Sequence, residues 1–367
     1  MIFYRFGFVG IMQMEYISLK DVCKINMGQS PDSSSYNDNE DGIPFFQGNA
    51  DFGERYPVTR VWCNAPTKIA QPGDILISVR APIGALNFAK EECCIGRGLA
   101  SLSPDKSKVS LEFIYWLLKG KKAELNSKGT GSTFKAISRK VLEETMVPAV
   151  DFDKQHEYAE ILEKIYNVIQ KRKEELSALD NLIKARFVEM FGDVQHEEKY
   201  KGIQLRELCT TMSGGTPSTK FPEYYEGDIP WISTVSLGPN YIDGTNAKGH
   251  ITQEAVDNSA TKLIPAGNIL FGTRVGVGKS SLNSVDICTN QDIVAIVGID
   301  ESKFNRLFIK HVLDAYQPYY DSIKKGATIL GITGDDLKDT LIPNVPIEIQ
   351  IEFEKFARQI DKSKVAA

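Results

Sequence analysis

Residues 72–84 read PGDILISVRAPIG, and residues 266–278 read AGNILFGTRVGVG. In both stretches a glycine precedes a short apolar run, which leads to an arginine and then to a second glycine at the same distance. A short apolar run bounded by turn residues is typical of a buried strand. The second stretch follows the first by 194 residues, which indicates that one structural unit occurs twice in the chain.

The repeat extends outward from these two stretches. Upstream, residues 17–31 match residues 203–217 at an offset of 186, and the prolines in Ile43-Pro-Phe-Phe and Asp228-Ile-Pro-Trp-Ile keep that offset. Further strands are predicted at 75–79, 269–273 and 293–297, and helices at 111–125 and 307–320. Each copy ends with a Lys-Gly turn and then a short apolar segment followed by proline. These are Lys128-Gly129 and Val147-Pro148 in the first copy, and Lys325-Gly326 and Ile342-Pro343 in the second.

A long helix is predicted between the two copies. Residues 155–190 contain no glycine or proline. Within them, mostly apolar residues recur at intervals of three and four and form a seam, and Glu and Lys occupy the other faces. At 1.5 Å per residue this helix spans roughly 54 Å. The seam is formed by Leu162, Ile165, Ile169, Arg172, Leu176, Leu179, Ile183, Arg186 and Met190.

A second helix of the same kind follows the second copy. Gln350, Phe353, Phe356 and Ile360 match residues of the first helix at an offset of 195, and this copy stops at Ala367, so we interpret it as a truncated one. The predicted class is therefore α+β. Its parts are a first domain at 1–153, a coiled-coil helix and linker at 154–199, a second domain at 200–346 and a short coiled-coil helix at 347–367.

Composition narrows the classes of function. The formal net charge of -5 and the lack of any segment that is basic overall exclude a polycation that coats nucleic acid, so DNA binding would depend on a few well-placed Lys and Arg side chains. The six cysteines show no C-x-x-C spacing and the four histidines are scattered, so we expect buried reduced thiols and no metal site.

The N-terminal stretch lacks a basic leader and a cleavage site, and no later run approaches the length of a membrane span. We therefore expect a cytoplasmic protein without a membrane partner. Residues 1–14 are interpreted either as a flexible extension or as the product of an upstream start codon. Gly28, Gly84, Gly214 and Gly278 are predicted to be turn residues that need a positive φ.

The order of domain, long helix, domain and helix resembles the specificity subunits of type I restriction and modification systems. Four segments carry the resemblance, and they occur twice and in order: residues 214–218 (GGTPS), 227–233 (GDIPWIS), 267–274 (GNILFGTR) and 129–138 (GTGSTFKAIS). In that family each target recognition domain reads one part of a split DNA target. The two long helices pair antiparallel, hold the domains apart and dock methyltransferase subunits.

The resemblance implies a non-catalytic subunit without a cofactor of its own. Its partners would be double-stranded DNA, modification subunits that bind S-adenosylmethionine and a restriction subunit that hydrolyses ATP. A helix of 21 residues at 347–367 would leave part of the 36-residue seam uncovered, so we also expect self-association or poor solubility of the chain alone and a discrete complex with modification subunits.

Candidate DNA-binding residues lie on equivalent loops of the two copies. Gln47 and Asn49 follow the 43–46 strand and carry amides that can pair with two atoms of adenine. Arg80 and Arg274 share one repeat position and could reach guanine or phosphate. Ser233 and Thr234 stand at the equivalent place in the second copy, a change expected if each domain reads a different sequence. We favour phosphate contact for a polar turn in each copy, formed by Lys128, Thr130, Ser132 and Lys135 and by Lys324, Lys325 and Thr328. Lys279 is a further DNA-binding candidate.

The sequence argues against two other functions and leaves a third open. Residues 272–280 contain Gly-Lys-Ser, but the first glycine of a phosphate-binding loop would have to stand at Thr273, which argues against a nucleotide hydrolase. A DNA methyltransferase would need an Asn/Asp-Pro-Pro-Tyr/Phe tetrapeptide, which the chain lacks. A protein-interaction adaptor with a repeated domain and a coiled coil remains the alternative, and no residue is predicted to be catalytic.

Overall fold

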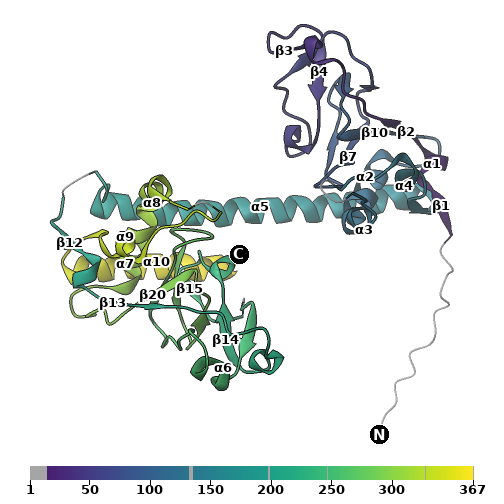
Figure 1. The fold of residues 1–367 in the computed structure, drawn as a ribbon. Coiled ribbons are helices and arrows are strands. Elements are labelled where there is room, and N and C mark those ends of the chain that lie inside the picture. The colour runs from purple at the N-terminus through teal and green to yellow at the C-terminus, as the bar shows by residue number, and fades with distance from the viewer. Residues whose placement is uncertain (1–14, 132–134, 197–198, 246, 327, 367) are drawn as a thin grey trace. The chain divides into compact units, whose positions relative to one another are not determined.

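The computed structural model describes residues 15–131, 135–196, 199–245, 247–326 and 328–366. It divides into two compact units, Met1–Gln170 and Lys171–Ala367, which we call unit 1 and unit 2. The long helix α5 (Phe152–Phe191) contributes residues to both of them (Figure 1). It begins three residues before the predicted helix and ends one residue after it, so the prediction of a continuous helix between the two copies is confirmed.

Unit 1 is built on two sheets and a helical layer. One sheet has the strand order β2-β10-β7-β8, with antiparallel pairs throughout. In the other, β3-β5-β4-β9-β6, only β4 and β9 run parallel. A further pair, β1 and β11, brings the two ends of the domain together. The bounds are β1 (Tyr16–Ser18), β2 (Cys23–Met27), β3 (Tyr36–Asn37), β4 (Ile43–Phe46), β5 (Trp62–Cys63), β6 (Ile69–Ala70), β7 (Ile75–Ser78), β8 (Leu86–Phe88), β9 (Cys93–Ile95), β10 (Leu99–Pro104), β11 (Met146–Pro148), α1 (Leu19–Val22), α2 (Leu111–Gly120), α3 (Lys122–Ser127) and α4 (Arg139–Glu143), with short 3-10 turns η1 (Ser33–Ser35) and η2 (Asn49–Asp51).

Unit 2 repeats this plan. The sheet β13-β20-β17-β18-β15 corresponds to the first sheet of unit 1, and β14 pairs in parallel with β19 as β4 does with β9. The bounds are β12 (Gly202–Gln204), β13 (Thr210–Ser213), β14 (Ile229–Ile232), β15 (Tyr241–Ile242), β16 (Gly249–Ile251), β17 (Ile269–Gly272), β18 (Ser280–Asn283), β19 (Cys288–Thr289), β20 (Ile293–Val297), β21 (Leu341–Pro343), α6 (Gln253–Asp257), α7 (Arg306–Ala315), α8 (Gln317–Ile323), α9 (Gly334–Lys338) and α10 (Ile347–Ala366), with turns η3 (Leu205–Glu207), η4 (Pro222–Tyr225) and η5 (Thr234–Ser236).

Each predicted domain helix is in fact two helices. The helix predicted at 111–125 breaks at Lys121 into α2 and α3, and the one predicted at 307–320 breaks at Tyr316 into α7 and α8. Gly120 weakens the first helix, and Pro318 supplies no N–H to continue the second.

A buried glutamine joins each domain to its long helix. In unit 1, Gln155 Oε1 accepts the backbone N–H of Ser110 at 2.8 Å, and its Nε2 donates to the Val150 carbonyl at 2.7 Å. In unit 2, Gln350 makes the same two bonds, to Asn305 and Val345, at 2.8 and 2.7 Å. Because satisfied buried amides fix geometry, the two helices leave their domains in the same way.

In unit 2 the C-terminal part of α5 lies beside α10 (Figure 1). Phe187 contacts Phe353, and further along Lys364 of α10 forms an ion pair with Asp180 at 2.6 Å. The pairing runs in opposite directions along the two helices, which confirms the predicted antiparallel arrangement. The core of unit 2 includes Ile183, Phe187 and Phe191 of α5 together with Phe308 of α7.

Two glycine predictions need correction. Gly84 and Gly278 have positive φ values of 82° and 84°, as predicted. Gly28 and Gly214 do not. A Cβ at Gly28 would lie 2.2 Å from the Gly96 carbonyl oxygen, and one at Gly214 would lie 2.1 Å from that of Asn290, so these glycines are required because another backbone segment approaches closely.

Within the described part of the chain, no helix is both long and apolar enough to span a membrane. Residues 1–14 lie outside it.

Candidate nucleic-acid interface

Three loops of unit 1 meet beyond the ends of the β7 and β9 strands. The backbone N–H of Ile137 donates to Val79 at 2.9 Å, and that of Ala81 donates to Lys135 at 3.0 Å, so the Arg80 loop is fixed to the loop at 128–137. The N–H of Gly98 donates to Gln47 at 3.1 Å and that of Val79 to Gly98 at 2.9 Å, which adds the loop after β4. The structure thus brings together candidate residues that are more than 80 positions apart in the sequence.

The same loops meet in unit 2 through equivalent bonds. The N–H of Ile332 donates to Thr273 at 2.8 Å, as Ile137 does to Val79, and Thr273 donates to Asp292 at 2.8 Å. A Cβ added at Gly272 would lie 3.4 Å from the Thr234 Cγ2, so the η5 turn packs against the Arg274 loop. Arg80 and Arg274 therefore occupy one position of the repeat, and both side chains are exposed.

The match that the sequence suggested between the loop at 128–137 and the loop at 324–332 was wrong by two residues. Residues 130 and 136 form a bridge that matches the bridge between 325 and 331, which is an offset of 195. Gly326, with a φ of 144°, therefore matches Gly131, with a φ of 122°, rather than Gly129 of the first Lys-Gly pair. The left-handed backbone, which favours glycine, sets the register.

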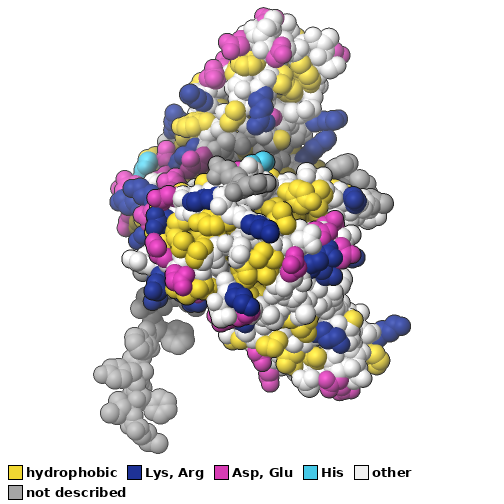
Figure 2. All heavy atoms as spheres, turned by 90° about the vertical axis from the view of Figure 1, so that its left-hand side faces the viewer, with side chains coloured by type: hydrophobic (Ala, Val, Ile, Leu, Met, Phe, Trp, Pro, Cys, Tyr) yellow, Lys and Arg dark blue, Asp and Glu magenta, His cyan; other side chains and the backbone are white. Residues whose placement is uncertain are grey.

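Four of these loop segments contain no carboxylate. Residues 79–85 and 128–137 of unit 1, and 273–279 and 324–332 of unit 2, include seven Lys or Arg residues and no Asp or Glu. The chain as a whole is acidic, and acidic and basic side chains are interspersed on the face shown in Figure 2. The absence of carboxylates is therefore local to the loops, which is what binding of a polyanion by an acidic protein requires.

The basic residues differ in their partners. Lys128 forms an ion pair with Glu124 at 2.7 Å, Lys324 is paired with Asp321, and Arg274 Nη1 lies 3.9 Å from Asp292. Among the residues that the structure describes, no ion pair is found for Arg80, Lys135, Lys279 and Lys325. These four exposed cations are the ones most available to a ligand.

The polar candidates of unit 1 differ in exposure around the turn that follows β4. In unit 1, Gln47 and Thr130 are exposed and Asn49 is half-buried, while Asp51 accepts the backbone N–H of Gln47 at 2.7 Å and closes the η2 turn. The carboxylate of Asp51 is therefore directed at its own backbone. The candidate Ser132 lies outside the described residues.

In unit 2 the equivalent turn is one residue closer to its strand. The bonds from Ser236 to Ser233 and from Leu237 to Thr234 match those from Asp51 and Phe52 at an offset of 185. Thr234 is consequently only 4% exposed, so its side chain is not accessible to DNA in this conformation, whereas Ser233 is half-buried. The exposed residue of the turn is Val235, which the sequence did not single out. Thr328, the last candidate, is exposed.

Lys279 does not belong to a phosphate-binding loop. Gly278 and Lys279 lead into strand β18, whereas the phosphate-binding loop leads into a helix whose N-terminus faces the anion. The structure thus agrees with the spacing argument against a nucleotide hydrolase.

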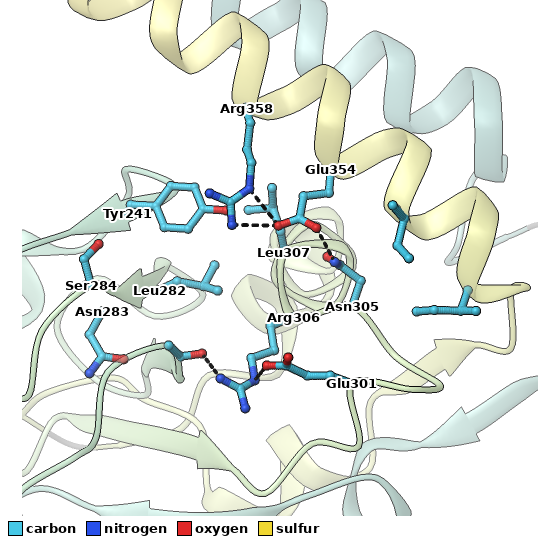
Figure 3. Close-up of a pocket in the computed structure, with 13 residues that line it drawn as sticks. Tyr241, Leu282, Asn283, Ser284, Glu301, Asn305, Arg306, Leu307, Glu354 and Arg358 are labelled. Carbon is cyan, nitrogen blue, oxygen red and sulfur yellow. Dashed lines mark hydrogen bonds and ion pairs between the residues drawn. The ribbon is translucent and has the colours of Figure 1, made fainter.

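A cavity of about 560 Å³ lies in unit 2 between α7, α10 and strand β15 (Figure 3). Its polar side chains pair with one another: Glu354 accepts from Asn305 at 2.6 Å and from Arg358 at 2.8 Å, and Arg306 donates to the Gly267 carbonyl at 2.7 Å. A smaller cavity of about 300 Å³ lies at the same repeat position in unit 1. Since the polar side chains of the unit 2 cavity pair with one another, we interpret this cavity as a packing gap between α10 and the domain rather than as a ligand site.

A second cavity of unit 2, about 740 Å³, contains a buried polar group. Lys310 Nζ donates to Asp314 at 2.7 Å, and Ser280 donates to the other oxygen of the same carboxylate at 2.7 Å. Burial, together with the nearby ammonium groups of Lys310, Lys364 and Lys184, holds the pKa of His311 well below its ordinary value of 6.5. His311 is therefore neutral at pH 7.

Cysteine chemistry and metal binding find no support in the described residues. Burial raises the pKa of the thiols of Cys23 and Cys93 to about 12, so both are protonated and unreactive at neutral pH. No group of three His, Cys, Asp or Glu side chains that could hold a metal ion occurs in this part of the chain.

Comparison with known proteins identifies a family whose sequence model matches this chain twice. The sequence pattern described as "Type I restriction modification DNA specificity domain" matches residues 12–178 and again residues 197–366. The chain is 45% identical over 152 residues to the putative type I restriction enzyme MjaX specificity subunit of Methanocaldococcus jannaschii, which covers 41% of this chain and 36% of that protein. It is 30% identical over 165 residues to the type I restriction enzyme EcoR124I/EcoR124II specificity subunit of Escherichia coli, covering 43% of this chain and 39% of that protein.

These alignments thus span little more than a third of each curated relative. A solved structure covers more. The crystal structure of a type I restriction-modification system S subunit from M. genitalium matches 98% of this chain and 92% of its own, with a TM-score of 0.57 and 13% identity. At that identity the match supports the shared fold.

Proposed function

The chain belongs to the type I restriction modification DNA specificity domain family, and on that premise we propose that it reads a DNA target in two parts, one with each unit, for a type I restriction and modification enzyme. The observation that carries the proposal is the pair of matching loop clusters. Each cluster places exposed cations on segments without carboxylates, in a chain that is otherwise acidic.

Within each cluster we assign contacts by chemistry. Gln47 and Asn49 are suited to adenine, and Arg80 and Arg274 to guanine or phosphate. Phosphate contact is assigned to a set of Lys, Ser and Thr residues, namely Lys128, Thr130, Ser132, Lys135, Ser233, Lys279, Lys324, Lys325 and Thr328.

The helix α5 supplies the spacing between the two parts of the target. Its 40 residues correspond to about 60 Å of continuous helix, because each residue adds 1.5 Å. Side chains of α5 are buried in each unit, among them Gln155 in unit 1 and Ile183 in unit 2.

The reaction itself is assigned to partner subunits. We propose that modification subunits and an ATP-dependent restriction subunit bind this chain in the cytoplasm, and that the purified chain neither methylates nor cleaves DNA nor hydrolyses ATP. Activity that stays with the chain at constant ratio through denaturation and refolding would contradict this.

Phosphate contacts give a test that does not depend on knowing the target. Lys135→Ala and Lys325→Ala should each weaken binding to all duplexes and lower the slope of log K against log salt by about 1. The control is Lys173→Ala, an exposed lysine on α5, which should leave the slope unchanged. Binding is measured by gel shift with modification subunits present.

The alternative of a protein-interaction adaptor predicts a different result in the same assay. An adaptor would bind no duplex from a random library at any salt concentration, and its loop variants would behave as the wild type does. Selection of a specific duplex would decide against it.

A further inference from the structure

The loop cluster of unit 2 exposes four aliphatic side chains. Val235 is 83% exposed, and Val275, Ile329 and Leu330 are each more than half exposed. Single exposed apolar residues are common, but several on adjoining loops with polar surroundings usually mark an interaction surface. Val275 lies on the loop that carries Arg274 and Lys279, and Ile329 and Leu330 lie on the loop that carries Lys325. Val235 lies on the separate η5 turn.

Backbone contacts hold these loops together. The N–H of Ile332 bonds to Thr273, and a Cβ at Gly331 would lie 2.8 Å from the carbonyl oxygen of Thr273, so the loop with Ile329 and Leu330 rests on the Arg274 loop. The η5 turn that carries Val235 packs on Gly272 through Thr234. The aliphatic side chains are therefore carried by loops that backbone contacts join to one another.

Unit 1 does not present the same chemistry. The turn alignment pairs Val235 with Ala50, and the repeat pairs Val275 with Ala81 and Leu330 with Lys135. Unit 2 thus has valine at two positions where unit 1 has alanine, and an apolar leucine at a third where unit 1 has a charged lysine. The position that corresponds to Ile329 lies outside the described residues of unit 1.

We propose that unit 2 reads thymine in its part of the target through contact of these aliphatic side chains, Val235 above all, with thymine methyl groups in the major groove. The C5-methyl of thymine is the apolar group that this groove displays, and apolar side chains recognise it. The neighbouring cations lie on segments 273–279 and 324–332, which contain no Asp or Glu, and this fits a surface that must approach phosphates at the same time. This inference rests on the proposed DNA-reading function and adds a base preference to it.

The test replaces thymine by uracil, which removes the methyl group and keeps the base-pairing edge. The duplex selected by the chain with its modification subunits is synthesised with dU at each dT, one position at a time. Loss of a methyl-sized contact should lower affinity about fourfold at one or more positions in the part of the target that unit 2 reads. In Val235→Ala, which removes an exposed side chain and should not affect folding, the dT and dU duplexes should bind equally at such a position.

Ala50→Gly in unit 1 is the matched control, and it should leave the dU effect unchanged. The inference is overturned if the target of unit 2 contains no thymine, if dT and dU duplexes bind equally to the wild type, or if the dU effect persists in Val235→Ala and in Ile329→Ala/Leu330→Ala. It is also overturned if these variants keep DNA affinity but lose the modification subunits, since that result assigns the surface to a protein partner. Failure to bind any specific duplex would instead refute the proposed function itself.

Discussion

The two units cover α5 to different extents. In unit 2 the C-terminal part of α5 packs against both α7 and α10, and Phe353 and Ala357 of α10 are completely buried. In unit 1 the residues at the same repeat positions, Tyr158 and Leu162 of α5, are 45% and 41% exposed. The same kind of helix thus lies in two environments, because unit 2 contains two long helices and unit 1 contains one.

The apolar seam of α5 has a different structural role in each unit. Where a second helix is present, the apolar positions form a core, and where it is not, they form a stripe on the surface. The exposed stripe of unit 1 includes Tyr158, Ile161, Leu162, Ile165, Val168 and Ile169. The self-association expected from the sequence stays a prediction, and this stripe is the surface on which we place it.

The largest expected effect is on stability. Phe187→Ala removes a side chain that is 3% exposed and packed against Phe191, Phe308 and Phe353, so it should lower the free energy of unfolding by about 3–5 kcal/mol. Ile165→Ala, on the exposed part of the same helix, should cost less than about 1 kcal/mol. Denaturant titration of both variants measures this, and equal losses would show that the two halves of α5 are equally covered.

The next effect concerns association. Ile165→Lys/Ile169→Lys places two charges in the exposed stripe and should weaken self-association at least tenfold, roughly 1.4 kcal/mol. Light scattering across a dilution series measures it. Val188→Lys, an exposed valine on the unit 2 part of α5, serves as the control. A wild-type chain that is monomeric at every concentration, and binds no hydrophobic dye, would mean that the stripe is not an association surface.

The smallest effect depends on pH and belongs to unit 2. The pKa of His311 is lowered in the folded state, so below its ordinary value of 6.5 the unfolded chain takes up a proton that the folded chain does not. Stability should therefore fall with decreasing pH by about 1 kcal/mol per unit below 6.5. Unit 1 has Trp116 at this repeat position, which does not titrate. His311→Gln should flatten the pH dependence measured between pH 7 and pH 5, and an unaltered slope would assign it to other groups.

The sequence predicts those features that depend on local pattern. The repeat, the strand from Ile75 to Ser78 and the long helix follow from spacing of apolar residues and from turn residues. The loops at 128–137 and 324–332 were matched two residues out of register, because a Lys-Gly pair occurs in both by coincidence. The feature that the two loops share is the positive φ of Gly131 and Gly326. Local residue identity does not reveal which glycine has that conformation.

The sequence predicted which loops form the candidate site, but it did not predict which of their side chains are exposed. The loops at 79–85 and 128–137 meet in unit 1, and those at 273–279 and 324–332 meet in unit 2. The first loop of each pair follows directly from a strand of the sheet, which fixes its position. The burial of Thr234 and the exposure of Val235 were missed, because they result from a turn that is one residue shorter in unit 2 and from its packing on Gly272. Such a shift depends on tertiary contact, which a loop sequence without periodicity does not encode.

The central claim is that each unit reads its own part of one DNA target through its own loop cluster. Arg80→Ala and Arg274→Ala, each assembled with modification subunits, are used to select duplexes from a random library. We predict that Arg80→Ala relaxes base preference in one part of the target and Arg274→Ala in the other, each by about 1–3 kcal/mol of discrimination, with the gap between the parts unchanged. Relaxation of the same bases by both variants, or of none by either, would contradict the account.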